Sequence, residues 1–246
     1  MARPRRRSNL TGDDLGKYGS VAAGTVNVDQ AAARMNIPKS QVREVIKQSK
    51  DAHRQTYFRA ISGRRGADAT GQGSPKGMLL GAFGRGARGA AVNAKAAADK
   101  LGVAVSTVRR WASGKQKPSA AHLDALQKAS RQATTTKAGR KSATADFRSS
   151  AAGQKAITGG TTLWISGNQG PGGNDTDRYT RDRTVAFPID VDDIQAMLRA
   201  YEEDGDAGVH GWLTDIADQK YVGDWGYISI DDFGFGQQRG RQDELW

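Results

Sequence analysis

The stretch that decides the fold runs from Ala97 to Trp111 and reads AADKLGVAVSTVRRW. Ala98 is a small residue of the kind found where two helices cross closely, and Gly102 tolerates the left-handed backbone of a tight turn. Val108 and Trp111 are spaced i, i+3, so both side chains point to one side of a helix. The stretch therefore predicts a helix-turn-helix, in which a tight turn joins two short helices.

A similar stretch lies 66 positions upstream. Residues 31–45 read AAARMNIPKSQVREV, with Ala32 as the small residue and Asn36 at the turn. We call residues 31–45 the first copy and residues 97–111 the second copy. Apolar residues fall at matching positions and predict one buried face in each copy. They are Met35, Ile37, Val42 and Val45 in the first copy, and Leu101, Val103, Val108 and Trp111 in the second.

The outward side of the second copy has the chemistry of a DNA-reading helix. Arginine can bond O6 and N7 of guanine bidentately, and hydroxyl groups can reach phosphates or base edges. The residues that we expect in the major groove are Ser106, Thr107, Arg109, Arg110 and Ser113. Lys115 and Lys117 follow in a basic turn and are expected to hold phosphate. The alternative is a small helical hairpin with a solvated, charged face.

The first copy has a similar but less basic outward side. Its candidate DNA-binding residues are Lys39, Ser40, Gln41, Arg43 and Lys47. Glu44 stands where the second copy has Arg110, and a carboxylate there repels the DNA backbone unless it accepts a hydrogen bond from a cytosine amino group. DNA contact and a role in helical packing or dimerisation both remain open for this copy.

The charge distribution also points to nucleic acid. Residues 1–155 hold 30 of the 37 basic and 9 of the 26 acidic residues, a net charge of +21, which leaves −10 for residues 156–246. A basic segment of this kind attracts polyanions and releases their counterions. The N-terminal arm is either a DNA-contacting arm or a solubilising tail. Its basic residues are Arg3, Arg5, Arg6 and Arg7.

Several function classes are disfavoured by composition. The chain has no cysteine and only three scattered histidines, so neither a disulfide framework nor a metal site is expected. Its glycines match no phosphate-binding loop, and its carboxylates fall at predicted helix ends and turns, so no cofactor and no enzymatic activity are expected. No apolar run of about 18 residues is present. We therefore expect a cytoplasmic, nucleoid-associated protein that does not bind membranes.

Composition and periodicity predict a mainly helical α+β protein, with two helix-turn-helix modules followed by a small α+β domain. In that last domain, strands are expected near 161–166, 183–187 and 226–230, with helices after Asp190 and near 207–220. The predicted divisions are a basic flexible arm at 1–25, the first helix-turn-helix at 26–62, a linker at 63–76, the second helix-turn-helix at 77–133, a basic linker at 134–156, the acidic α+β domain at 157–235 and a tail at 236–246.

Residues from about Met78 to Ile230 resemble the telomere terminal proteins that cap and prime the ends of linear actinobacterial chromosomes and plasmids. The shared pattern is the second copy, the turn KQKP at 115–118, and a polar loop that leads into TVAFP at 184–188. The first copy is an addition to that pattern. The resemblance implies binding to DNA ends, a role as protein primer in DNA replication, and a DNA polymerase and a telomere-associated protein as partners.

The resemblance also implies a nucleotide acceptor. Members of the family are thought to carry the DNA 5′ end on a threonine in the acidic loop before the strand at 184–188. Thr176, between Asp175 and Asp177, is the match here, one position from the family's threonine. A threonine hydroxyl attacks an activated phosphate only with the help of a polymerase's metal ions. The alternative is a turn or capping threonine.

Other functions remain open beside this one. Two helix-turn-helix copies and an acidic domain that could form a homodimer also fit a transcriptional repressor or a plasmid partition or replication regulator. The basic arm and the predicted linkers fit a structural nucleoid protein. DNA is the expected partner in all three.

Overall fold

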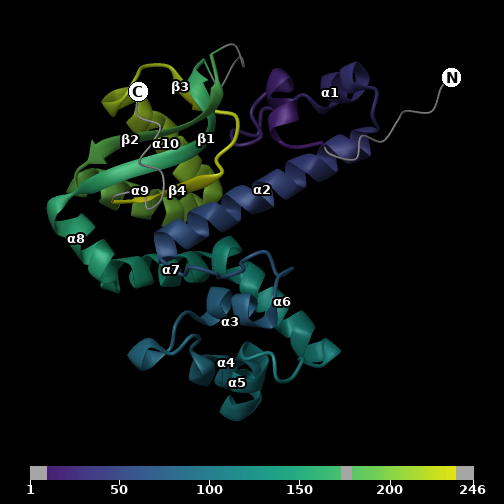
Figure 1. Cartoon of the computed structure of the whole chain (residues 1–246), viewed down its shortest axis with the longest axis vertical. Helices are drawn as coiled ribbons and strands as arrows, with labels where there is room; N and C mark the ends of the chain where they lie inside the picture. The colour runs from purple at the N-terminus through teal and green to yellow at the C-terminus, as the bar shows by residue number, and fades with distance from the viewer. Residues whose placement is uncertain (1–9, 173–178, 237–246) are drawn as a thin grey trace.

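The computed structural model describes residues 10–172 and 179–236. These form a mainly helical α+β structure (Figure 1), which confirms the predicted fold class. The elements in chain order are the 3-10 helix η1 (Asp13–Tyr18), α1 (Val28–Met35), α2 (Lys39–Ser62), α3 (Pro75–Phe83), the 3-10 helix η2 (Ala87–Gly89), α4 (Ala94–Leu101), α5 (Val105–Ala112), α6 (Ala120–Thr135), α7 (Lys137–Ser149), α8 (Ala151–Gly159), β1 (Thr161–Pro171), β2 (Arg181–Ile189), α9 (Val191–Asp204), α10 (Asp206–Lys220), β3 (Trp225–Tyr227) and β4 (Asp232–Phe235).

The sheet is built around β1. β2 pairs antiparallel with one edge of β1, and both β3 and β4 pair antiparallel with its other edge. Leu163 and Ile165 of β1 are fully buried, in the same hydrophobic cluster as Leu198 of α9 and Leu213 of α10. The strands predicted near 161–166 and 183–187 are therefore confirmed as β1 and β2, which form an antiparallel pair, with β1 continuing five residues beyond the predicted end at 166.

Helix α9 begins as the sequence predicts. The carboxylate of Asp190 accepts the backbone N–H of Asp193, and the carboxylate of Asp193 accepts the backbone N–H of Asp190, at 3.0 and 2.8 Å. This reciprocal cap satisfies donors that the first turn leaves unpaired. The apolar residues spaced for one helix face are all buried: Ile194, Met197, Leu198 and Tyr201.

The strand predicted at 226–230 is interrupted. β3 ends at Tyr227 and β4 begins at Asp232, because the backbone bulges between them. The N–H groups of Ile228 and Ser229 both donate to the carbonyl oxygen of Asn168, a two-to-one pairing that breaks the ladder. Alternation of apolar residues, on which the prediction rested, does not reveal a bulge.

Segment 63–76, predicted as a flexible linker, is instead a packed connector. Only 3% of Arg64 is exposed, and its guanidinium donates to Asp146 of α7 and to the carbonyl oxygen of Gly81 in α3, at 2.7 and 2.6 Å. The carboxylate of Asp68 accepts the backbone N–H groups of Thr70 and Gly73. The prediction was wrong because a polar residue is expected to be exposed to solvent unless its partners, which here are distant in the sequence, are known.

The prediction of a basic linker at 134–156 is also wrong. It contains the end of α6, all of α7 and part of α8. Thr136 and Ser150 cap α7 and α8 by accepting the N–H groups of Gly139 and Gly153, and Phe147 is buried. Serine and threonine, read as linker composition, serve here as helix caps.

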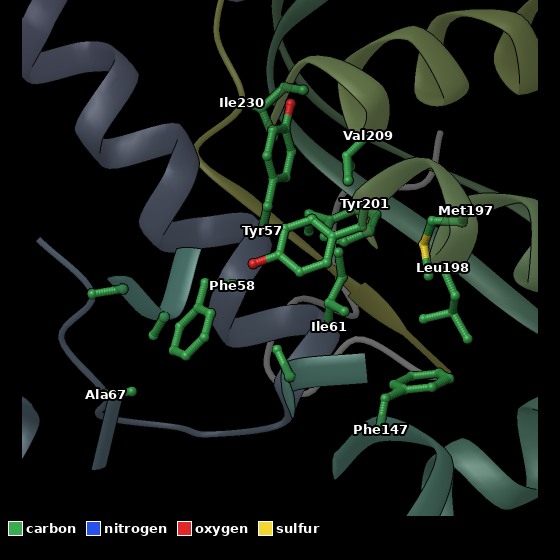
Figure 2. Packing of buried hydrophobic residues seen from close by; sticks show 14 of the residues in the cluster. Tyr57, Phe58, Ile61, Ala67, Phe147, Met197, Leu198, Tyr201, Val209 and Ile230 are labelled. Atoms are coloured by element: carbon green, nitrogen blue, oxygen red, sulfur yellow. The ribbon is translucent and has the colours of Figure 1, made fainter. Parts of the chain in front are cut away.

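Two hydrophobic clusters organise the described residues. One joins residues of the first copy to Leu15 and Val21, so residues 10–25 are not the flexible arm that was predicted. The other is continuous from the C-terminal half of α2 through the second copy to the sheet. Figure 2 shows the ring of Tyr201, from α9, lying against α2 beside Tyr57 and Ile61. Of the described helices, none combines the length and apolar character needed to cross a bilayer.

Two buried histidines make the packing of α2 against the sheet and α10 sensitive to acid. Burial lowers the pKa of both His53 and His210 from 6.5 to about 4, and repulsion from His210 adds to the effect on His53. His53 accepts the backbone N–H of Ile230 at 3.2 Å. Because the unfolded chain takes up these protons first, the stabilisation is complete above about pH 6.5 and is lost as the pH falls toward about 4.

We therefore expect the free energy of unfolding to fall by up to about 3 kcal/mol per histidine over this range. Urea titrations at about pH 7 and about pH 4.5 measure the change. His53→Gln combined with His210→Gln should reduce the difference between the two pH values. An equal difference in this variant and the parent would show that other groups are responsible.

The buried Arg64 gives a second test of the fold. Arg64→Ala leaves the carbonyl of Gly81 and the carboxylate of Asp146 without this donor, so we expect the free energy of unfolding to fall by about 3 kcal/mol. Arg64→Lys should also destabilise, because one ammonium group cannot reproduce the guanidinium's fork of donors. Arg65→Ala, at the exposed neighbouring position, is the matched control. Equal denaturation midpoints for the Arg64→Ala and Arg65→Ala variants would contradict the assignment.

Candidate nucleic-acid interface

The two copies have the same local structure. α1 and α4 begin at Val28 and Ala94, and α2 and α5 begin at Lys39 and Val105, so both pairs of starts are 66 positions apart. α1 and α4 each begin with an asparagine cap: Asn27 accepts the N–H of Gln30, and Asn93 accepts the N–H of Ala96. The repeat predicted from the sequence is thus a structural repeat.

The turns of the two copies also match. Asn36 and Gly102 end α1 and α4 in the left-handed region, with φ of 53° and 66°. The next residue closes the turn in each copy: Ile37 N–H donates to the carbonyl of Ala32, and Val103 N–H to that of Ala98, both at 3.1 Å. These bonds explain why an asparagine or a glycine is required at the turn.

The inward side of α5 is firmly packed. Val108 is fully buried and Trp111 is 3% exposed, with its ring centroid 5.5 Å from that of His122 in α6. α3 lies under the second copy and contacts α4, α5 and α6. Its buried residues include Met78 and Leu79. This packing fixes which residues α5 can present to a ligand.

The outward side of α5 lies where the sequence predicts. Arg109 and Arg110 are exposed, and neither forms an ion pair with an acidic side chain within residues 10–172 and 179–236. Thr107 is half-buried at the first turn of the helix. The remaining predicted residues of this copy are also exposed: Ser106, Ser113, Lys115 and Lys117. α5 thus offers two free guanidinium groups and several hydroxyl groups on one accessible side.

Sequence reasoning missed two exposed arginines in the loop between α3 and α4. This loop reads GRGARG at 84–89 and carries Arg85 and Arg88, and Arg88 has a positive φ of 56°. Its base is tied to the start of α4, because Asn93 N–H donates to the carbonyl of Gly84 at 2.9 Å. Arginines spaced among glycines were the available signal.

The first copy presents a partly different surface. Lys39 pairs with Asp29 at 2.9 Å, and Glu44 accepts a hydrogen bond from Gln48 at 3.0 Å. The other predicted residues lie along the start of α2: Ser40, Arg43 and Lys47 are exposed, and Gln41 is half-buried. The candidate arginines Arg3, Arg5, Arg6 and Arg7 and the candidate acceptor Thr176 lie outside the described residues.

Comparison with known proteins supports the second copy. A family model described as helix-turn-helix matches residues 92–129, which contain α4, α5 and the first part of α6. No curated protein and no solved structure matches the chain. The resemblance to telomere terminal proteins therefore gains no support from these comparisons and stays a prediction. Residues 92–129 carry a helix-turn-helix DNA-binding motif, and this motif is the interface that sequence and geometry identify together.

Proposed function

We propose that the protein is a sequence-specific DNA-binding regulator that reads duplex DNA with α5. One observation carries the proposal: Arg109 and Arg110 are exposed on α5, while Val108 and Trp111 bury its opposite side. A helix with one side anchored in a core can enter the major groove, which is about 12 Å wide, and hold its outward side chains against base edges.

Phosphate contacts complete the proposed complex. Lys115 and Lys117 follow α5 in an exposed turn, where Gly114 has a φ of 74°. Arg85 and Arg88 provide two more exposed cations from the loop before α4. Contacts of this kind fix the register of a protein on the duplex without reading its sequence. Base recognition is thus assigned to α5 and positioning to the residues around it.

The helix-turn-helix supports a regulatory role more directly than it supports a role specific to DNA ends. A transcriptional repressor and a plasmid partition or replication regulator both need a helix-turn-helix and a second surface for assembly. The α+β domain has such a surface, because β2 is an edge strand of the sheet and Tyr221 beside it is 43% exposed. We propose that this edge forms the homodimer contact.

The proposed roles predict different effects of substitution. Arg109→Ala and Arg110→Ala should each weaken binding to a selected target by about 1–3 kcal/mol while changing binding to random duplex less. Lys115→Ala and Lys117→Ala should weaken both similarly and reduce the salt dependence of binding. Fluorescence anisotropy at several salt concentrations separates the two effects. Lys155→Ala, an exposed cation on α8, is the control, and unchanged target preference in both arginine variants would refute the assignment of α5.

A telomere terminal protein is the second candidate. The observation that favours it is the β hairpin: the residues 184–188 on which the resemblance depends form part of β2, paired with β1 as expected. In this role the chain would bind DNA ends, act with a DNA polymerase and a telomere-associated protein, and accept the first nucleotide on Thr176.

This candidate has a direct chemical test. The full chain is incubated with labelled deoxynucleotides and the replicon's DNA polymerase, and labelled peptides are mapped by mass spectrometry. We expect label on Thr176 that disappears in Thr176→Ala, while duplex binding by the second copy persists. Absence of label, with a polymerase active on an authentic terminal protein, would leave the regulator as the only candidate.

A further inference from the structure

The first copy shares the local geometry of the second copy. The turn between its two helices lies at positions equivalent to those of the second copy. The first helix has the same asparagine cap, and the turn is closed by the same backbone hydrogen bond. Val42 and Val45 are buried where Val108 and Trp111 are buried. The start of α2 is therefore anchored by buried side chains as α5 is, and its outward side is exposed.

That outward side has cations in a row along the helix. Arg43, Lys47 and Lys50 are exposed at i, i+4 and i+7, which places them on one side of α2. None of the three forms an ion pair with an acidic side chain of residues 10–172 or 179–236. A row of exposed, unpaired cations can contact DNA phosphates and position the helix on a duplex.

The copies differ where bases would be read. Arg43 corresponds to Arg109, so both copies keep an arginine at this place. Glu44 corresponds to Arg110, and a carboxylate can accept from a cytosine amino group but repels a phosphate. The two copies are thus suited to related but different base sequences.

The two copies lie at different ends of the structure. α2 has 24 residues, a length of about 36 Å. Arg54 in its middle pairs with Asp206 of α10 at 2.8 Å, and the hydroxyl of Ser20 donates to the carbonyl of Tyr227 at 2.5 Å, so the first copy is attached to the α+β domain. Figure 1 places α1 at one end of the molecule and α4 with α5 at the opposite end.

We propose that the first copy is a second duplex-DNA site, so that a single chain binds two DNA segments at once, one at each end. The inference rests on the proposed function only for the segment bound by the second copy. Because the two sites lie at different ends of the structure, two separate duplexes, or two distant sites on a looped duplex, are the ligands that fit. Holding both on one chain raises the effective concentration of the second segment.

The first experiment separates the two sites. A pool of random-sequence duplexes is selected with the full chain carrying Arg43→Ala and Lys47→Ala, and independently with the chain carrying Arg109→Ala and Arg110→Ala. We expect two different enriched sequences, one for each intact copy. Melting curves like that of the parent chain show that these exposed substitutions leave the fold intact. Enrichment in the first selection and none in the second would overturn the inference and leave the proposed function standing. The reverse would overturn the proposed function, and with it the binding of two segments by one chain, while the first copy would remain a DNA site.

The second experiment measures bridging. A duplex with one enriched sequence is fixed to beads, and capture of a fluorescent duplex with the other sequence is recorded. We expect the parent chain to capture the fluorescent duplex, and the amount captured to fall by about tenfold or more in the variant with Arg43→Ala and Lys47→Ala. The variant with Lys141→Ala and Lys155→Ala loses the same number of exposed cations elsewhere and should capture normally. Undiminished bridging by the first-copy variant would overturn the inference, since a dimer that uses two second copies would then explain it.

Discussion

The buried guanidinium of Arg64 is the constraint on which the arrangement of this protein depends. It lies just beyond the end of α2 and bonds to Asp146 and Ser142 of α7 and to the carbonyl of Gly81 in α3. Its planar group also lies 5.5 Å from the ring centroid of Phe58. Burying an arginine is costly unless its donors are satisfied, and here each partner comes from another part of the chain. This side chain therefore adds directional bonds to the continuous hydrophobic cluster that joins α3 and the second copy to α2 and α7.

This constraint explains which parts of the fold could be predicted from the sequence. Turns and caps depend on residues that are close together in the chain. The turns at Asn36 and Gly102 and the helix cap at Asp190 could therefore be predicted from residue type and spacing alone. The buried side of α5 could also be predicted, because Val108 and Trp111 follow helical periodicity. The exposed side of a helix is set once its buried side is known, which is why Arg109 and Arg110 are exposed as expected.

The parts that could not be predicted depend on partners far away in the sequence. Arg64 and Asp146 are 82 positions apart, and nothing in the local composition at 63–76 distinguishes a buried arginine from a solvated one. The segment at 134–156 failed for a related reason. Its small and polar residues form helices because Ala143 and Phe147 can bury against the rest of the core. The arginine loop at 84–89 was missed because its position depends on backbone hydrogen bonds, such as that from Asn93 N–H to the carbonyl of Gly84, which residue types do not reveal.

The same distant contacts decide which charges can reach DNA. Three of the four basic residues of α7 do not contribute freely to the positive charge of residues 1–155, because the acidic end of α9 engages them. Lys137 pairs with Glu203, Arg148 pairs with Glu202, and Arg140 donates to the carbonyl oxygens of both glutamates. Such exposed pairs add little stability, but they reduce the attraction of this region for phosphate. Among the described residues, cations without an ion pair lie on α5, on the loop before α4 and at the start of α2, and also elsewhere on the surface, as at Lys141 and Lys155. Net charge thus overstates the positive charge that residues 1–155 can offer to DNA, because acidic residues within the fold engage part of it.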